Sequence, residues 1–157
     1  MQYQSMVQNS PDYWQQQLPT WLEVKRSKKF VSPVKSNPIQ GSEDVAAAFS
    51  FLRELLHEEL HVLALTASNH ILHATKVGMG GPGGVSCYAA DFFRMPLVVG
   101  ARGVIVVHNH PSGNSRPSPE DIFFTQELMK VAHVLKITLL DHVVIGEDHS
   151  SIINLIS

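Results

Sequence analysis

The stretch VIVVHNHPSGNSRPSPED, residues 104–121, carries most of the information about the fold of this 157-residue chain. Residues 104–107 form a continuous run of β-branched side chains, which is typical of a strand buried on both faces of a sheet. His108 and His110 follow this run, and side chains alternate along an extended segment. Both imidazoles are therefore expected on the same side of the end of the strand.

The tetrapeptide SPED at residues 118–121 predicts the start of a helix that runs to about residue 135. Serine is favoured at the N-cap, proline at the first helical position and acidic residues in the first turn. A helix start has no need of two histidines eight and ten residues upstream of its serine. We therefore predict a metal site of His108, His110 and Asp121, with one ligand position open for water, which is the layout of a catalytic zinc.

The remaining sequence predicts strands that alternate with helices, and hence an α/β fold with a mixed central sheet flanked by helices. We expect a helix capped by Ser42, a hairpin, a second helix over 88–99, and three short strands after the 119–135 helix. The glycine-rich residues 78–84 match no phosphate-binding pattern and are expected to form a flexible flap. The predicted inward-facing residues are Val45, Ala48, Phe49, Leu52, Leu55 and Leu56 in the first helix and Phe92, Phe93 and Leu97 in the second. The predicted strands are 60–66, 71–77, 137–140, 143–145 and 152–156.

Composition places the chain among single-domain intracellular proteins. An apolar content of 44% is enough for one globular core. Cys87 is the only cysteine, which excludes an intrachain disulfide and a thiolate zinc cage, so any metal must be held by nitrogen and oxygen ligands. No apolar run reaches the ~18 residues of a membrane span, and no signal peptide is visible. We expect a cytoplasmic protein without a membrane partner.

Residues 1–40 are predicted to be a polar, poorly structured leader, with the folded domain at 41–157. The leader has five basic and two acidic residues, a balance of +3. Because the whole chain has a net charge of −2, residues 41–157 have a net charge of −5. A solvated tail is the favoured interpretation of this basic stretch, and contact with nucleic acid is the alternative. Trp14 and Trp21 would dock on the domain or on a second subunit, so a homodimer stays open.

The spacing His108-x-His110-x7-Ser118-x2-Asp121 resembles the JAMM (MPN-plus) metalloprotease motif, and HNHPSG followed by PS-x-x-D is similar to its RadC branch. The resemblance covers roughly residues 41–157. It implies a cytidine-deaminase-like JAB/MPN architecture and a zinc-dependent peptidase or isopeptidase. RadC-type proteins usually carry an upstream helix-hairpin-helix domain, in whose place this chain has its polar leader.

The resemblance also implies roles for individual residues. The family glutamate that precedes the first hairpin strand matches Glu58 when the strands are aligned without gaps. Glu58 would be the general base that takes a proton from a water at the zinc, and Glu59, the alternative, would face the opposite side. Ser118 would stabilise the oxyanion of an amide substrate. His142 is interpreted as a satisfied structural residue.

Three functional hypotheses follow from the sequence. The first is a Zn²⁺ metallohydrolase that acts on a peptide or isopeptide. The second is a DNA-repair-associated or other nucleic-acid accessory protein, for which the basic leader is the only feature. The third is a non-catalytic metal-binding scaffold, against which the open ligand position and Glu58 both count, because structural zinc sites normally have four protein ligands.

Overall fold

The structure is a computed structural model that describes residues 37–80 and 87–156. The leader up to residue 36, with both tryptophans, and residues 81–86 of the predicted flap lie outside this part. None of the described helices is long and apolar enough to cross a membrane. The elements, in chain order, are α2 (Ser42–Ala48), the 3-10 helix η1 (Ser50–Glu54), β1 (Glu59–Leu65), β2 (Ile71–Met79), α3 (Ala89–Val98), β3 (Gly103–Asn109), α4 (Pro119–Leu135), β4 (Thr138–Ile145), β5 (His149–Ser151) and α5 (Ile153–Ile156).

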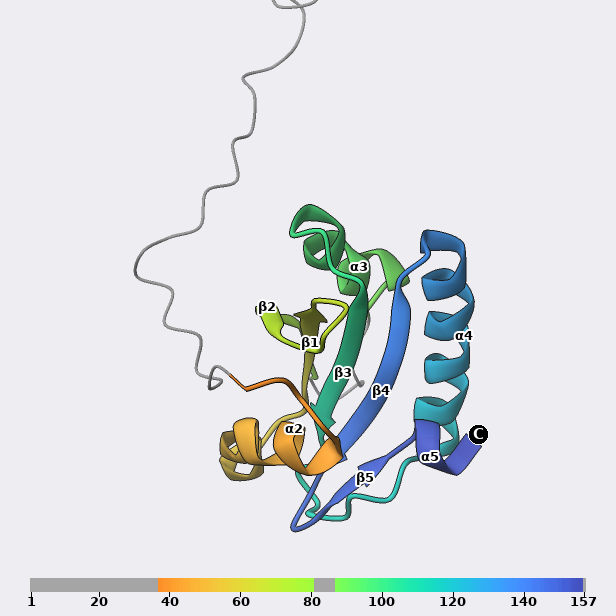
Figure 1. Cartoon of the computed structure of the whole chain (residues 1–157). Helices are drawn as coiled ribbons and strands as arrows, with labels where there is room; N and C mark the ends of the chain where they lie inside the picture. The colour runs from red at the N-terminus through yellow and green to blue at the C-terminus, as the bar shows by residue number, and fades with distance from the viewer. Residues whose placement is uncertain (1–36, 81–86, 157) are drawn as a thin grey trace, which may run out of the picture. The chain divides into compact units, whose positions relative to one another are not determined.

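A mixed five-stranded sheet of order β2-β1-β3-β4-β5 forms the centre of the fold (Figure 1). β3 and β4 pair in parallel, and the other neighbours pair antiparallel. A parallel pair needs a crossover connection, and α4 supplies it along the side of β4. The chain therefore leaves the end of β3 and enters the first turn of α4 at the same edge of the sheet.

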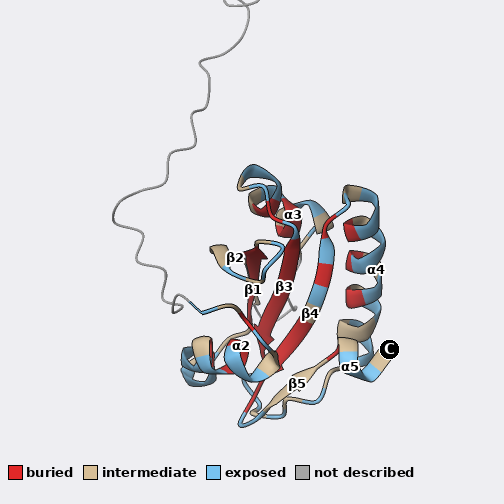
Figure 2. Cartoon of the chain, viewed as in Figure 1, coloured by how far each residue is buried: buried red, intermediate tan, exposed pale blue. Residues whose placement is uncertain are grey.

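Helices cover both faces of the sheet, which confirms the predicted α/β class. α2 and η1 pack on one face through Val45, Phe49 and Leu52. α3 and α4 pack on the other through buried residues that include Phe92, Phe93 and Leu128. β1 and β3 lie between these two apolar layers and are buried along their whole length (Figure 2), as the β-branched run of β3 predicted.

The helix expected after Ser42 is shorter than predicted. Ser42 is its first residue and Gly41 is the N-cap, so the predicted serine cap is wrong by one position. α2 ends at Ala48, and η1 follows with about three residues per turn instead of 3.6. The predicted apolar face continues as far as Leu55, whereas Leu56 lies beyond the end of η1 and is 95% exposed.

The second helix forms as predicted despite Pro96, but one of its predicted core residues is wrong. Phe92 and Phe93 are buried, whereas Leu97 is 53% exposed. Pro96, four residues after Phe92 on the same side of the helix, is buried. Leu97 lies in the last turn of α3, which ends at Val98.

The C-terminal strands also differ from the prediction. The two short strands expected at 137–140 and 143–145 are one continuous strand, β4. Asp141 does not interrupt it, because the Asp141 carboxylate accepts hydrogen bonds from the His142 N–H and the Ser151 hydroxyl. Residues 152–156 were predicted as a strand, but they follow β5, and Ile153–Ile156 form the short helix α5. A short apolar run has no periodicity that separates a strand from a helix.

A buried carboxylate joins β1 to β2 on the α2 side of the sheet. Glu59 lies 3.0 Å from His57 Nε2, 2.9 Å from His61 Nε2 and 3.0 Å from Lys76 Nζ. Burial alone would raise the pKa of Glu59, but these three donors outweigh burial and lower the pKa to about 2. The ionised carboxylate is therefore the form that the fold stabilises.

We predict that Glu59→Gln lowers the free energy of unfolding by about 2 kcal/mol at pH 7. Because folding lowers the pKa of Glu59, its contribution is complete above the ordinary value of 4.5 and disappears as the pH falls toward about 2. Urea unfolding at pH 7 and pH 3 measures the effect, with the exposed Glu54→Gln as control. An equal deficit of Glu59→Gln at both pH values would contradict this account.

Candidate metal centre

His108 and His110 meet at the edge of the sheet where β3 ends. His108 is the next-to-last residue of β3 and is fully buried, while His110 follows the strand and is half-buried. Their Nε2 atoms lie 3.0 Å apart, as the alternation of side chains predicted. A 3.0 Å approach of two imidazole nitrogens requires a shared proton or a cation between them, because two facing lone pairs repel.

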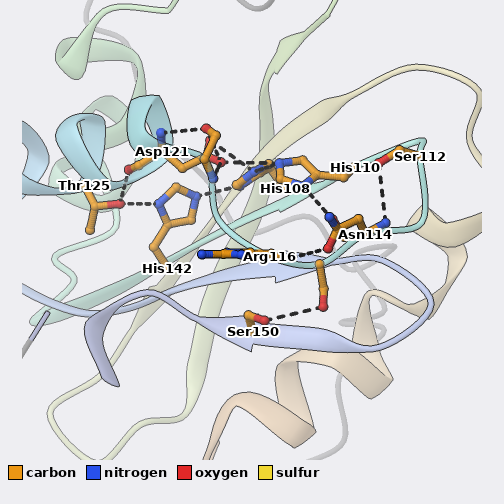
Figure 3. Close-up of polar contacts among 11 residues, drawn as sticks. His108, His110, Ser112, Asn114, Arg116, Asp121, Thr125, His142 and Ser150 are labelled. Carbon is orange, nitrogen blue, oxygen red and sulfur yellow. Dashed lines mark hydrogen bonds and ion pairs between the residues drawn. The ribbon is translucent and has the colours of Figure 1, made fainter. Parts of the chain in front are cut away.

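Asp121 reaches the histidines from the first turn of α4. Its Oδ1 lies 3.3 Å from His108 Nε2, and its Oδ2 lies 3.3 Å from His110 Nε2 (Figure 3). Ser118 is the N-cap of α4 and forms a capping box with Asp121. Asp121 Oδ2 accepts from the Ser118 N–H at 2.8 Å and from its hydroxyl at 2.7 Å. The same carboxylate thus caps the helix and faces the two imidazoles.

The three side chains fit a metal ion. Ligand bonds of about 2.0–2.1 Å at tetrahedral angles place neighbouring ligand atoms roughly 3.3 Å apart. The two imidazole nitrogens lie 3.0 Å apart, and each lies 3.3 Å from one of the two oxygens of the Asp121 carboxylate, which is close to this spacing. Among the described residues, His108, His110 and Asp121 are the only group of three or more His, Cys, Asp or Glu side chains with such convergent ligand atoms.

A buried chain of hydrogen bonds sets the tautomer of His108. The Thr125 hydroxyl donates to the Asp121 carbonyl oxygen at 2.6 Å and accepts from His142 Nδ1 at 2.6 Å (Figure 3). Complete burial lowers the pKa of His142 well below its ordinary value, so His142 is neutral and its Nε2 is an acceptor. His108 Nδ1 donates to that atom at 2.7 Å, which leaves the Nε2 lone pair of His108 for a metal.

His110 is oriented by the loop that follows it. Its Nδ1 donates to the Asn114 carbonyl oxygen at 2.8 Å, so its Nε2 also faces the site. Gly113 has φ +80°, in the left-handed region that glycine favours, and closes this loop. The loop packs on Gly146, where an added Cβ would lie 2.3 Å from the Gly113 carbonyl oxygen. A side chain at position 146 would therefore displace the loop that holds His110.

The charges of the site favour an ionised carboxylate beside imidazole. Burial alone would raise the pKa of Asp121, but hydrogen bonds with His108 and His110 outweigh it and hold the pKa well below its usual range. The hydrogen bond with Asp121 raises the pKa of His110. The site therefore holds an anion that attracts a proton or a metal cation, and a metal would displace the proton.

A cavity of about 420 Å³ opens beside these residues. Glu58 lines it together with His110, Ser118 and Asp121. The rest of the lining consists of Leu60, Cys87, Glu120 and Phe124. Glu59 is absent from this lining and binds His57, His61 and Lys76 instead. Glu58 therefore faces the cavity, and the adjacent Glu59 does not.

Sequence reasoning did not identify the residues that support the ligands. The sequence favours a structural histidine at His142 and does not indicate its direct hydrogen bond to His108. Thr125 and Asn114 were not singled out at all. Only the spacing of Thr125, four residues after Asp121 on the same helix face, could have suggested that it lies close to the site.

We predict that Thr125→Val weakens metal binding by roughly 10- to 100-fold without unfolding the protein. Valine keeps the shape of threonine but leaves His142 Nδ1 without its acceptor, so the orientation of His108 is no longer fixed. Competition for Zn²⁺ with a fluorescent chelator measures the affinity, and Thr138→Val on exposed β4 surface is the control. Equal affinities of Thr125→Val and the unmodified protein would exclude this role.

Comparisons with known proteins show the family of the chain. The model of the RadC-like JAB domain matches residues 39–155. A UPF0758 protein of Shouchella clausii is 34% identical over 124 residues, which are 79% of this chain and 53% of the relative. A UPF0758 protein of Carboxydothermus hydrogenoformans is 41% identical over 91 residues, 58% of this chain and 40% of the relative. The chain spans about half the length of these curated relatives. From the match of the domain model over residues 39–155, the chain belongs to the RadC-like JAB domain family.

Proposed function

We propose that the protein is a zinc-dependent hydrolase of amide bonds, of the peptidase or isopeptidase type. The observation that carries the proposal is the shared cavity, because His110 and Asp121 of the candidate metal group and the carboxylate of Glu58 line the same 420 Å³ space. Two imidazoles and one carboxylate are typical of catalytic zinc sites, which keep one position open. Zinc, when bound, would supply Lewis acidity that makes water a nucleophile at neutral pH and polarises a carbonyl.

Glu58 is proposed as the general base. It lies one residue before β1, so its side chain alternates with that of Glu59 and shares the cavity side with Leu60. No hydrogen bond or ion pair joins the Glu58 carboxylate to another described residue, whereas Glu59 is held by three donors. Glu58 is therefore the carboxylate that can accept a proton from a water and pass it to the leaving amine.

Ser118 is proposed to donate a hydrogen bond to the oxyanion of the substrate. In the structure its hydroxyl accepts from the Asp121 N–H at 3.1 Å and donates to Asp121 Oδ2 at 2.7 Å. The acceptor bond can persist while the proton turns toward a carbonyl oxygen in the cavity, since a hydroxyl rotates freely about its C–O bond. This turn would make the bond available in the transition state.

The charge of the cavity supports an amide substrate over a phosphodiester. Three of its eight lining residues are acidic, namely Glu58, Glu120 and Asp121, and none of these eight is Lys or Arg. A phosphodiester substrate would need cations to offset its charge. The basic stretch that raised the nucleic-acid alternative lies in residues 1–40, of which the structure describes only the last four.

We predict that Glu58→Gln retains zinc but lowers kcat for amide hydrolysis at least about 100-fold, because the amide cannot accept the proton of the water. The substrates are internally quenched peptides, with a second set in which the scissile amide joins a carboxyl end to a lysine ε-amine. Glu54→Gln removes the same charge from an exposed position and is the control.

Hydrolysis by Glu58→Gln at the rate of the unmodified protein would remove Glu58 from the mechanism. Failure of the zinc-loaded unmodified protein to cleave either substrate set would contradict the proposed activity itself. Zinc analysis of both samples separates these outcomes from a loss of metal.

A further inference from the structure

The side chain of Asn109 extends the β1–β3 ladder beyond its last backbone pair. The ladder ends where Leu60 lies opposite His108, so Glu59 would be the next residue opposite Asn109. At that point Asn109 Oδ1 accepts from the Glu59 N–H at 2.8 Å, and Asn109 Nδ2 donates to the His57 carbonyl oxygen at 3.0 Å. The amide thus supplies one acceptor and one donor, as a further residue pair of an antiparallel ladder would.

These two bonds hold the backbone on both sides of Glu58. The Glu58 carbonyl oxygen itself accepts from the Gly80 N–H at 2.7 Å, beyond the end of β2. Asn109 is 1% exposed, so water does not compete for its amide, and a buried amide that lost its partners would be costly. The segment 57–59 is therefore fixed from the β3 side by Asn109 and from the β2 side by Gly80.

Asn109 lies between the two histidines of the candidate metal group, so the clamp that its two hydrogen bonds form on the backbone around Glu58 is directly linked to that group. His108 and His110 leave the chain on one side, and Asn109 leaves it on the other by strand alternation. One tripeptide thus contributes two residues of the candidate metal group and holds the backbone of the neighbouring glutamate. The position of Glu58 relative to the candidate metal group is therefore fixed by a short link through Asn109, without a longer path through the core.

We propose that Asn109 is the positioning residue of the general base, which it acts on by clamping the backbone on either side of Glu58. The inference rests on the proposed function, because it takes Glu58 to be the base. Asn109 itself does not touch the substrate or the metal. Its loss would leave the ligands in place and let the Glu58 carboxylate drift from the water that it must deprotonate, where a displacement of about 1 Å can cost 100-fold in rate.

The test is Asn109→Leu, which keeps the branching and the number of heavy atoms of the side chain and removes both hydrogen bonds. We expect zinc content equal to that of the unmodified protein, a kcat on the quenched peptides at least about 10-fold lower, and a KM within about twofold. In a Glu58→Gln background, Asn109→Leu should lower kcat no further, because two residues that act through one step are not additive. Independent lowering of kcat in that background, or loss of zinc in Asn109→Leu, would overturn the proposal.

Hydrogen exchange of the Glu59 amide supplies a readout that does not depend on activity. We expect this amide to exchange as slowly as that of Val62 in the middle of β1, and at least about 10-fold faster in Asn109→Leu. Ser151→Ala, which removes a side-chain hydrogen bond on β5, is the matched control and should leave Glu59 unchanged. Rapid exchange of Glu59 in the unmodified protein would overturn the clamp even if Asn109→Leu failed to fold. If no substrate were cleaved, the proposed function would be contradicted. Hydrogen exchange and zinc content would still show whether Asn109 holds the backbone around Glu58.

Discussion

The parallel pairing of β3 with β4 is the constraint on which the site depends. A parallel pair forces the chain to return through a crossover, and here α4 is that crossover. The end of β3 and the first turn of α4 therefore meet at one edge of the sheet. His108 and Asp121 are 13 positions apart in the chain, and this topology brings their side chains to within 3.3 Å.

Several residues at this edge serve the fold and the site together. The Ser118–Asp121 capping box satisfies backbone groups that a helix start leaves unpaired, and it also orients the Asp121 carboxylate toward the imidazoles. The Thr125 hydroxyl forms hydrogen bonds with the Asp121 carbonyl oxygen and with the His142 ring. α4, which carries Asp121, therefore also orients His108 through His142. A metal there would bind to side chains that the fold has already positioned, which reduces the entropy lost on binding.

The sequence predicted the parts of this arrangement that depend on local pattern. The β-branched run before His108, the SPED helix start and the alternation of Glu58 with Glu59 each follow from a spacing of a few residues. The contacts of His142 with His108 and of Asn109 with Glu59 could not be predicted, because they join residues 34 and 50 positions apart. Leu56 and Leu97 were misplaced for a related reason, since Leu56 lies beyond the end of η1 and Leu97 in the last turn of α3, and periodicity alone does not locate a helix end.

His108, His110 and Asp121 are proposed to hold one metal ion together. The most direct test is elemental mass spectrometry of protein purified without chelators, incubated with Zn²⁺ and then dialysed. We expect about one zinc per chain, lost in both His110→Ala and Asp121→Ala and retained in His133→Ala, which removes an exposed histidine of α4. Protein that stays free of zinc after this treatment, or variants that bind as much zinc as the unmodified chain, would contradict it.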